Sequence, residues 1–275
     1  MKNFSDILLV SDVDGTFLSG EAEGLNKNLD AIGQFKKMGG LFTFATGRDL
    51  NSLSEVIPNA AQIVNAPMIT SNGARVYDFD IGEYIYDCPV KNKALLAEIA
   101  GQIYKLYPET GIRFSCENNL AIPKFNKMLK HDLKDISLEK LRVMEINLDE
   151  LIISEIKIYK CVIVNSPETL EEIRQICKEY DKNNELFFSK SYLTGLEAVD
   201  KHGTKGHAAL FLKKHTGNNR RLAAAGDYEN DITMLKMADI AAAPENAPEQ
   251  VKTAAHVITA DCKSGAIYDF INNKL

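Results

Sequence analysis

Short apolar runs alternate with amphipathic stretches along the first ninety residues of the chain. The apolar run at 7–10 is too short for a helix and has polar neighbours, which is typical of a buried strand. Apolar residues then recur at helical spacing over 29–38. Further apolar runs at 41–45 and 68–70 predict two more strands, with a helix over 50–57 between them. This succession favours parallel strands joined by right-handed helical crossovers, as in a doubly wound (Rossmann-like) sheet.

The middle of the chain has a different pattern. Two stretches, 83–90 and 111–122, resemble isolated strands, and 93–107 has the apolar face of a helix. Apolar and polar residues alternate over 152–164, which predicts a half-exposed antiparallel strand, and 167–180 predicts another helix. Helices mixed with alternating strands indicate a small α+β unit.

After about residue 195 the first pattern returns, with a predicted helix over 205–214 and a strand over 222–225. An insertion therefore interrupts one α/β domain. The predicted domains are a discontinuous core, 1–88 and 190–275, and an inserted α+β domain, 89–189.

Composition and charge restrict the class of protein. Of 275 residues, 45% are hydrophobic and 25% are charged, which excludes disordered, collagen-like and coiled-coil chains. The net charge of −6 disfavours binding to nucleic acid, which requires a basic face. The N-terminal apolar run ends at Asp12, far short of the ~20 residues of a membrane span. We therefore expect a cytoplasmic protein without a membrane or nucleic-acid partner.

The five cysteines agree with a reducing compartment. Their number is odd, their spacings are wide and no C-x-x-C pair occurs. A metal site or a redox pair is the functional alternative, but small buried hydrophobic side chains explain them better.

Four polar clusters fall at ends of predicted strands or at the start of a helix, where α/β sheets bind ligands. They are Asp12-Val13-Asp14-Gly15-Thr16, Thr46-Gly47-Arg48, His202-Gly203-Thr204-Lys205-Gly206 and Gly226-Asp227-Tyr228-Glu229-Asn230-Asp231. Turn formation, a helix cap with a solvated arginine, and a capped helix start each explain one cluster taken alone. A cation such as Lys205 at a helix N-terminus disfavours the helix itself, which suggests an anionic partner.

Together the clusters predict a metal and phosphate site. They would bring four carboxylates to one sheet edge: Asp12, Asp14, Asp227 and Asp231. Two bare carboxylates about 4 Å apart repel by roughly 4 kcal/mol at an effective dielectric near 20, so four require a cation. Oxygen ligands without Cys or His favour Mg²⁺ over zinc. Since Thr46, Arg48 and Lys205 add donors for an oxyanion, the implied chemistry is metal-assisted phosphoryl transfer to an aspartate.

In this order the clusters resemble the motifs of the haloacid dehalogenase (HAD) superfamily of phosphatases, specifically its Cof-like members with a large α/β cap. Ser71-Asn72-Gly73-Ala74 and Asn246-Ala247 are further similarities. The resemblance extends over 7–271, and the cap, 89–189, is the part without recognised motifs. Glu245 stands where the family commonly has glycine, so the shape of that loop stays open.

The resemblance implies a role for each motif residue. Asp12 would be the nucleophile that forms an aspartyl-phosphate, and Asp14 would protonate the leaving oxygen and then activate water. The Mg²⁺ site would consist of Asp12, the Asp14 backbone carbonyl, Asp227 and, as a more distant support, Asp231. The phosphate and substrate site would be lined by Thr46, Gly47, Arg48, Asn72, Lys205 and Asn230.

We therefore expect a Mg²⁺-dependent phosphatase of small phosphorylated metabolites, above all sugar phosphates, acting as a monomer or homodimer. A phosphomutase of the phosphomannomutase type shares the motifs and is one alternative. A non-catalytic sensor of a phosphorylated ligand is another, although such a protein could lose its nucleophile and both Asp12 and Asp14 are present. Four polar residues of the insertion are candidates for contact with the leaving group, or else solvated surface residues: Arg113, Asn118, Asn119 and Lys124.

Overall fold

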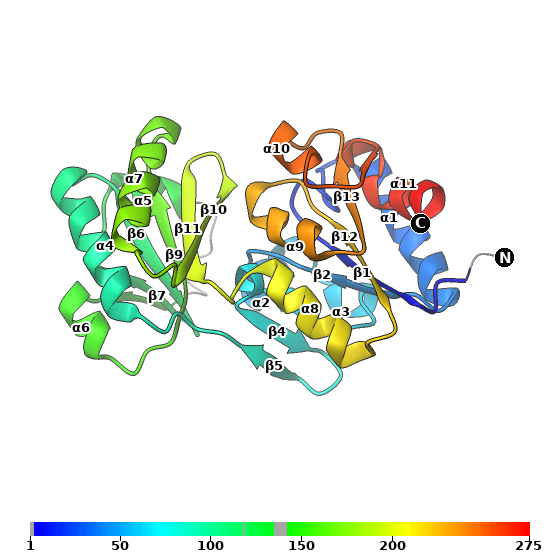
Figure 1. Ribbon diagram of the computed structural model, residues 1–275, viewed down its shortest axis with the longest axis horizontal. Helices are drawn as coiled ribbons and strands as arrows, with labels where there is room; N and C mark the ends of the chain where they lie inside the picture. Colours follow the sequence, from blue (N-terminus) through cyan, green and yellow to red (C-terminus); the bar gives the residue numbers. More distant parts are fainter. Residues whose placement is uncertain (1–2, 118, 135–141) are drawn as a thin grey trace. The chain divides into compact units, whose positions relative to one another are not determined.

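The computed structural model describes residues 3–117, 119–134 and 142–275. The chain forms two compact units (Figure 1). The core unit comprises Met1–Asp87 and Thr204–Leu275, and the inserted unit comprises Cys88–Gly203.

A parallel five-stranded sheet forms the centre of the core unit, in the order β14-β13-β12-β1-β2. Its strands are β1 (Ile7–Ser11), β2 (Leu41–Phe44), β12 (Arg221–Ala225), β13 (Ile240–Pro244) and β14 (Val257–Thr259). Every residue of β1 is buried, as expected for a central strand covered on both faces. The predicted doubly wound α/β fold is confirmed.

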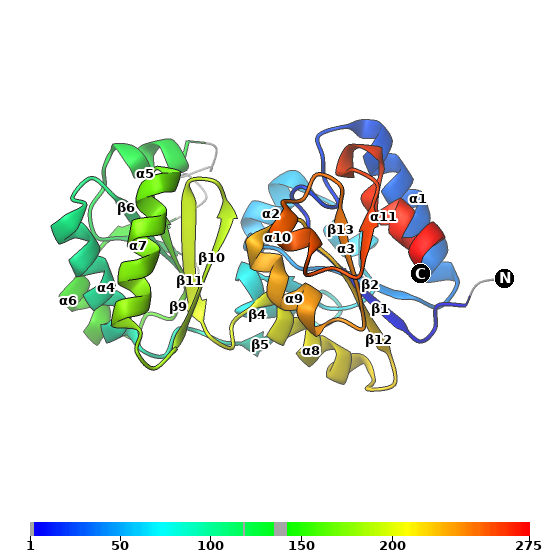
Figure 2. The same cartoon turned by 45° about the horizontal axis from the view of Figure 1, so that its top comes forward.

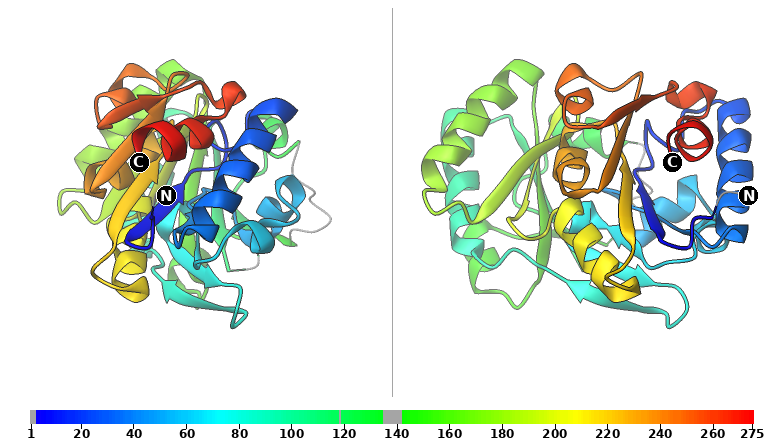
Figure 3. Two further views of the ribbon diagram at one scale, coloured as in Figure 1. Left: turned by 90° about the vertical axis from the view of Figure 1, so that its right-hand side faces the viewer. Right: turned by 45° about the vertical axis from the view of Figure 1, so that its right-hand side comes forward.

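Helices cover both faces of this sheet (Figure 3). One face packs against α1 (Ala22–Lys37), α2 (Leu50–Val56), α3 (Ala60–Ile63) and α11 (Ala266–Asp269), and the other packs against α8 (Lys205–Thr216) and α9 (Ile232–Met237). The alternation of β1 explains this arrangement, because Ile7 and Leu9 join the first apolar cluster and Leu8 and Val10 join the second. Short turns complete the unit: η1 (Ser71–Gly73), η2 (Glu229–Asp231), α10 (Glu249–Lys252), η3 (Cys262–Ser264) and η4 (Phe270–Lys274).

An antiparallel sheet of three strands also belongs to the core unit. It consists of β3 (Met68–Thr70), β4 (Arg75–Asp78) and β5 (Glu83–Asp87). A single parallel bridge between Ala45 and Ile69 connects it to the end of β2. The strand predicted over 83–90 is therefore paired within the core unit rather than isolated in the middle region, because β5 forms a hairpin with β4.

The inserted unit contains a six-stranded sheet in the order β10-β11-β9-β6-β7-β8. Its strands are β6 (Gly111–Cys116), β7 (Asn119–Ile122), β8 (Arg142–Glu145), β9 (Ile158–Val164), β10 (Leu186–Tyr192) and β11 (Gly195–Asp200), and its helices are α4 (Lys93–Leu106), α5 (Lys127–Asp132), α6 (Leu148–Ile153) and α7 (Pro167–Tyr180). Cys161 and Ile163 face the cluster of α4, α6 and α7, whereas Val162 and Val164 pack near Leu129 of α5. Figure 2 shows α4 and α7 beside one another on the sheet.

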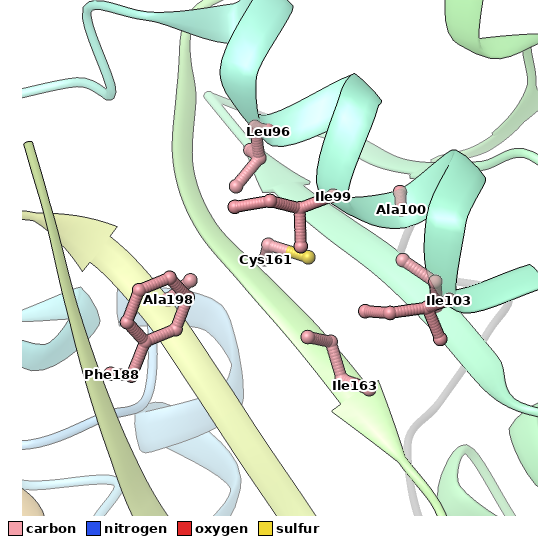
Figure 4. Close-up of a pocket in the computed structure, with 9 residues that line it drawn as sticks. Leu96, Ile99, Ala100, Ile103, Cys161, Ile163, Phe188 and Ala198 are labelled. Carbon is pink, nitrogen blue, oxygen red and sulfur yellow. The ribbon is translucent and has the colours of Figure 1, made fainter. Parts of the chain in front are cut away.

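Figure 4 shows a pocket in the hydrophobic core of the inserted unit. It is lined by Leu96, Ile99, Ala100, Ile103, Ile112, Cys161, Ile163, Phe188 and Ala198. Burial raises the pKa of the Cys161 thiol far above its ordinary value, so this side chain stays protonated. The pocket therefore belongs to the packing of α4 against the sheet. All five cysteines are free thiols, and all except the half-buried Cys116 are buried, in agreement with their interpretation as hydrophobic side chains.

Three details of the inserted unit differ from the sequence patterns. The stretch 111–122 forms two strands, β6 and β7, paired as a hairpin. The half-exposed strand predicted over 152–164 is wrong in its bounds and in its exposure. Its first residues lie in α6, and β9 is buried along its whole length because it is central in the sheet. The predicted boundary after 189 falls inside β10, which pairs with β11 and so remains in the inserted unit.

Candidate active site

The topology of the core sheet brings two motifs to one edge. The chain passes from β1 to β2 on one side and returns to β12 on the other side of β1, so the strand order reverses between β1 and β12. Asp12 follows β1 directly, and its backbone N–H donates to the carbonyl of Ala225, the last residue of β12 (2.8 Å). Asp227 follows two residues later. Open α/β sheets bind their ligands at such a switch point.

Three of the four predicted acidic residues meet there. One carboxylate oxygen from each of Asp12, Asp227 and Asp231 lies within 4.8 Å of the others. Asp12 and Asp231 are buried, and Asp227 is half-buried. The carboxylate of Asp14 is outside this cluster, which leaves its backbone carbonyl as the group assigned to the metal.

Lys205 lies between two of these carboxylates. Its ammonium donates to Oδ1 of Asp12 and to Oδ1 of Asp231, each at 2.6 Å, and its side chain is fully buried. Lys205 is the first residue of α8, whose N-cap Thr204 accepts a hydrogen bond from the backbone of His207. The anions that accompany this lysine at a helix N-terminus are therefore carboxylates of the protein itself.

Burial and mutual repulsion control the charges of the cluster. Burial raises the pKa of Asp12 well above its ordinary value; Lys205 opposes this shift, and Asp231 and Asp227 add to it. Burial, followed by Asp231, raises the pKa of Asp227 to about 6. Burial alone would lower the pKa of Lys205, but Asp12 and Asp231 outweigh it and raise that pKa. Three carboxylates around one ammonium thus retain an excess of negative charge, which a divalent cation would neutralise.

The donor set fits Mg²⁺. Each member offers carboxylate oxygen, and neither histidine nor cysteine belongs to the cluster found among the described residues. The turn after β1 leaves room for these oxygens, because a Cβ on Gly15, where φ is +88°, would lie 2.4 Å from Oδ2 of Asp227. The hydroxyl of Thr16 donates to the other oxygen of Asp227 (2.9 Å) and orients the carboxylate.

Asp231 organises the turn that carries Asp227. Its Oδ2 accepts hydrogen bonds from the backbone N–H groups of Asp227 and Tyr228 (3.1 Å each). A capped start of α9 does not explain this cluster: Asp231 occupies the N-cap position of α9, but its side chain makes no capping bond there because it is turned back into the site. Gly226 permits this, since a Cβ there would lie 2.4 Å from that of Asp231.

The second motif forms a tight turn after β2. The buried hydroxyl of Thr46 accepts the backbone N–H of Arg48 (3.1 Å), and the cap of α2 is Asp49 rather than Thr46. A Cβ on Gly47 would lie 2.7 Å from Oδ1 of Asn72, so glycine allows the two turns to approach.

Asn72 connects this turn to the fourth motif. Its backbone is left-handed (φ +61°) and its N–H donates to the carbonyl of Thr46 (3.0 Å). Its side-chain Oδ1 accepts from Nδ2 of Asn230 (3.1 Å), and both side chains are buried. The structure thus brings Gly47, Asn72 and Asn230 together as predicted, with Thr46 beside them.

Arg48 pairs with a carboxylate instead of being only solvated. Its Nε and one terminal nitrogen donate to the two carboxylate oxygens of Asp14, at 2.8 and 2.9 Å. The hydrogen bond to Asp14 raises the pKa of Arg48 further above its ordinary value. Two residues that sequence reasoning assigned to separate roles are therefore paired with one another.

One structural residue of the site received no role from the sequence. Asn246 donates to the carbonyl of Gly15 (3.0 Å) and accepts from the backbone N–H of Cys262 (2.9 Å). It joins the loop after β13 to the turn after β1. Its two side-chain hydrogen bonds hold the loop after β13, in which Glu245 stands where the family commonly has glycine. The Asn246-Ala247 pair was the only signal that could have indicated it.

Two of the four polar candidates of the inserted unit, Arg113 and Lys124, have local partners. Arg113 is buried and pairs with Asp132 (2.8 Å), and Lys124 donates to the carbonyl of Pro108 (2.8 Å). Asn119 has a buried Oδ1 without a hydrogen-bond partner among the described residues. Asn118 lies outside the described residues.

Comparisons with known proteins agree with this geometry. The family model for haloacid dehalogenase-like hydrolases matches residues 9–271. A Mycoplasma genitalium protein whose name classes it as a phosphatase is 23% identical, with 97% of this chain and 98% of its own covered. A solved structure from Thermotoga maritima is 28% identical, with a TM-score of 0.75 and 98% and 97% of the chains covered.

Another solved structure, that of the HAD subclass IIB sugar phosphatase BT4131, is 23% identical and has a TM-score of 0.76, with 95% and 96% of the two chains covered. In the part of the chain that the structure describes, no helix has the length and hydropathy needed to cross a membrane. Since the family model covers nearly the whole chain and the motifs meet at one sheet edge, the protein belongs to the haloacid dehalogenase-like hydrolases, as a phosphatase of the Cof-like type.

Proposed function

We propose that this phosphatase hydrolyses small phosphorylated metabolites, sugar phosphates among them, with Mg²⁺ and through an aspartyl-phosphate on Asp12. The observation that carries the proposal is the buried cluster of Asp12, Asp227 and Asp231 around Lys205. A carboxylate that is buried, oriented by an ammonium and close to a cation site has what a nucleophile toward a phosphate dianion needs.

The metal would be held by the carboxylates of Asp12 and Asp227 and by the backbone carbonyl of Asp14, with Asp231 supporting the turn. When bound, Mg²⁺ would neutralise the cluster and polarise the oxygens of the phosphoryl group. Without that neutralisation, the carboxylates would repel the substrate dianion.

Two carboxylates, those of Asp12 and Asp14, take part in the covalent steps. An oxygen of Asp12 forms a bond to phosphorus while the bond from phosphorus to the leaving oxygen breaks, and Asp14 gives that oxygen a proton. Asp14 then accepts a proton from water, which attacks phosphorus, releases inorganic phosphate and restores Asp12. General acid–base catalysis of this kind contributes about 10²–10⁴-fold.

The donors for the transferring group would come from the neighbouring turns and from Lys205. The hydroxyl of Thr46 accepts the N–H of Arg48, so its own proton is available to a phosphoryl oxygen. The side chains of Asn72 and Asn230 and the ammonium of Lys205 belong to the same edge of the core unit. We assign Thr46, Gly47 and Lys205 to the phosphoryl group.

We also propose a division of labour between the units. The discontinuous core carries the chemistry described above, and the inserted unit acts as a cap that contacts the part of the substrate beyond the phosphate. The sugar phosphatase activity named for one structural neighbour supports the choice of sugar phosphates as the first substrates to test.

The experiment is a screen of phosphorylated metabolites for release of inorganic phosphate, with Mg²⁺ and with excess EDTA. We expect hydrolysis of several sugar phosphates that stops in EDTA and returns with Mg²⁺. Transfer between positions of a sugar that requires a bisphosphate activator would instead identify a phosphomutase. Tight binding of a metabolite without turnover would identify a sensor, and full activity in EDTA would contradict the Mg²⁺ site.

A further inference from the structure

The fork between Arg48 and Asp14 joins two motifs that follow different strands. Arg48 is fixed at its backbone from two sides: its N–H donates to the hydroxyl of Thr46, and its carbonyl accepts the N–H of Ser71 (3.0 Å). Its guanidinium therefore starts from a defined position. A fork of two parallel N–H···O bonds fixes the plane and the rotation of the carboxylate that it binds.

Asp14 has no comparable support of its own. It lies on the tight turn after β1, where the N–H of Gly15 donates to the carbonyl of Leu18 (2.9 Å), and its side chain is 53% exposed. Among the residues that the structure describes, Arg48 is the hydrogen-bond partner of its carboxylate. A half-exposed aspartate without such a partner would rotate among several side-chain conformations.

The pair adds little to the stability of the fold. Arg48 is 33% exposed, and half-exposed ion pairs contribute about 0–1 kcal/mol because water and salt screen them. Its geometry is nevertheless more specific than that of the exposed ion pair between Asp6 and Arg221, the first residue of β12, whose side chains are joined by a single contact of 3.1 Å. A weak pair with a strict geometry at the reacting edge suits orientation better than stabilisation.

We propose that Arg48 is a positioning residue for Asp14: its guanidinium holds the carboxylate in one orientation, so that this group is aligned with the leaving oxygen of the substrate. The proposal rests on the proposed function, in which Asp14 protonates that oxygen. It gives Arg48 a role different from the direct contact with phosphate or substrate that the sequence motif suggested.

The two roles predict different kinetics. A leaving sugar alkoxide needs a proton, whereas a p-nitrophenolate leaves as a stable anion. A residue that acts through Asp14 affects kcat/KM for a hexose 6-phosphate much more than for p-nitrophenyl phosphate. A residue that binds the phosphoryl group affects both substrates equally, because the phosphoryl group is the same.

The experiment measures kcat/KM for both substrates, with Mg²⁺, for the full-length enzyme and four variants: Arg48→Ala, Arg48→Lys, Asp14→Asn and the double variant Asp14→Asn/Arg48→Ala. We expect Arg48→Ala to lower kcat/KM for the hexose phosphate by about 10-fold or more, and for p-nitrophenyl phosphate by less than threefold. Lysine should restore part of the loss, since it supplies the charge but not the fork. The double variant should be no slower than Asp14→Asn, because the effect of Arg48 passes through Asp14.

Arg221→Ala is the matched control, and we expect it to leave kcat/KM unchanged for both substrates. Equal losses on both substrates for Arg48→Ala, or losses that multiply in the double variant, would overturn the positioning role. If Asp14→Asn itself shows no dependence on the leaving group, the acid assigned in the proposed function is wrong, and the inference fails with it. Should Arg48→Ala not fold, Arg48→Lys provides the same comparison.

Discussion

At the scale of single residues, the site depends on the balance between one ammonium and the carboxylates that are buried with it. Lys205 contacts Asp12 and Asp231 at 2.6 Å, and none of the three side chains is more than 9% exposed. Removing a carboxylate and removing the ammonium therefore have different consequences. Loss of a carboxylate reduces the repulsion among the anions, whereas loss of the ammonium leaves buried carboxylates without a neutralising charge.

Asp12→Asn should abolish turnover while the protein stays folded. The amide has the same shape as the carboxylate but is not a nucleophile, and Lys205 keeps its bond to Asp231. We expect phosphate release to fall by at least about 10³-fold, as for other lost nucleophiles. Steady-state kinetics and circular dichroism test this; wild-type turnover in the variant would disprove the covalent mechanism.

Lys205→Met should damage both stability and activity. Methionine fills much of the volume, but Asp12 and Asp231 then remain buried without their shared cation. Breaking a buried ion pair on one side costs about 3–5 kcal/mol, and we expect Mg²⁺ to offset part of this. A fall of kcat for every substrate in the panel is expected. A loss confined to some substrates would move Lys205 from the phosphoryl group to the leaving group.

At the scale of elements, turns rather than helices or strands bring the motifs together. The turn after β1 approaches the turn after β12 at Gly15 and Asp227, and the turn after β2 approaches that after β3 at Gly47 and Asn72. In both cases a glycine faces an oxygen of the neighbouring turn at a distance that a side chain would occupy.

Gly15→Ala should weaken the binding of Mg²⁺. The added methyl group would lie 2.4 Å from the carboxylate of Asp227 and would displace it. Gly20→Ala is the matched control, since Gly20 also has a positive φ (+80°) but nothing within 4 Å of its Cβ position. Both variants bear backbone strain of about 1–3 kcal/mol. Calorimetric titration with Mg²⁺ should show a loss of affinity in the Gly15 variant alone; similar affinity in both would argue against Asp227 as a ligand.

At the scale of the whole molecule, the acidic cluster links stability to pH and to metal. Asp227 has a pKa of about 6 in the fold against 3.8 as its ordinary value, and the pKa of Asp12 is raised as well. The folded state therefore keeps protons on these groups that the unfolded chain has released. Raising the pH from 3.8 to about 6 thus lowers the contribution of Asp227 to the stability of the fold, and the raised pKa of Asp12 acts in the same direction.

We expect Mg²⁺ to remove this penalty. The rise in unfolding temperature on addition of Mg²⁺ should be small near pH 5 and reach several degrees near pH 7, where the carboxylates are ionised and bind the ion. Thermal unfolding in EDTA and in excess Mg²⁺ across this pH range measures the difference. Asp227→Asn should abolish most of it, and a stabilisation that does not depend on pH would contradict the linkage.

The amino-acid pattern was sufficient for the core fold and for three carboxylates that meet at the candidate site, but it gave no role to Asn246 and placed the Asp14 carboxylate with the others. The buried strand at 7–11 and the helix of Lys205 are recognisable locally, because period and boundary residues belong to neighbouring positions. Since the carboxyl ends of parallel strands share one edge, a doubly wound fold places Asp12 and Asp227 at the same edge of the sheet. That the two are neighbours there follows from the pairing of β1 with β12.

The tertiary structure determines which side chains of the site bond to one another. The bonds from Lys205 to Asp12, from Asn230 to Asn72 and from Arg48 to Asp14 join residues that are 193, 158 and 34 positions apart. Local periodicity carries no signal for such pairs. The same limit applies to β9, whose alternating sequence indicated a solvent-facing side, although its central place in the inserted sheet buries every residue. Residue types and the ends of strands can be recognised along the chain itself. The pairing of charged side chains depends on loops that come into contact only when the sheet is assembled.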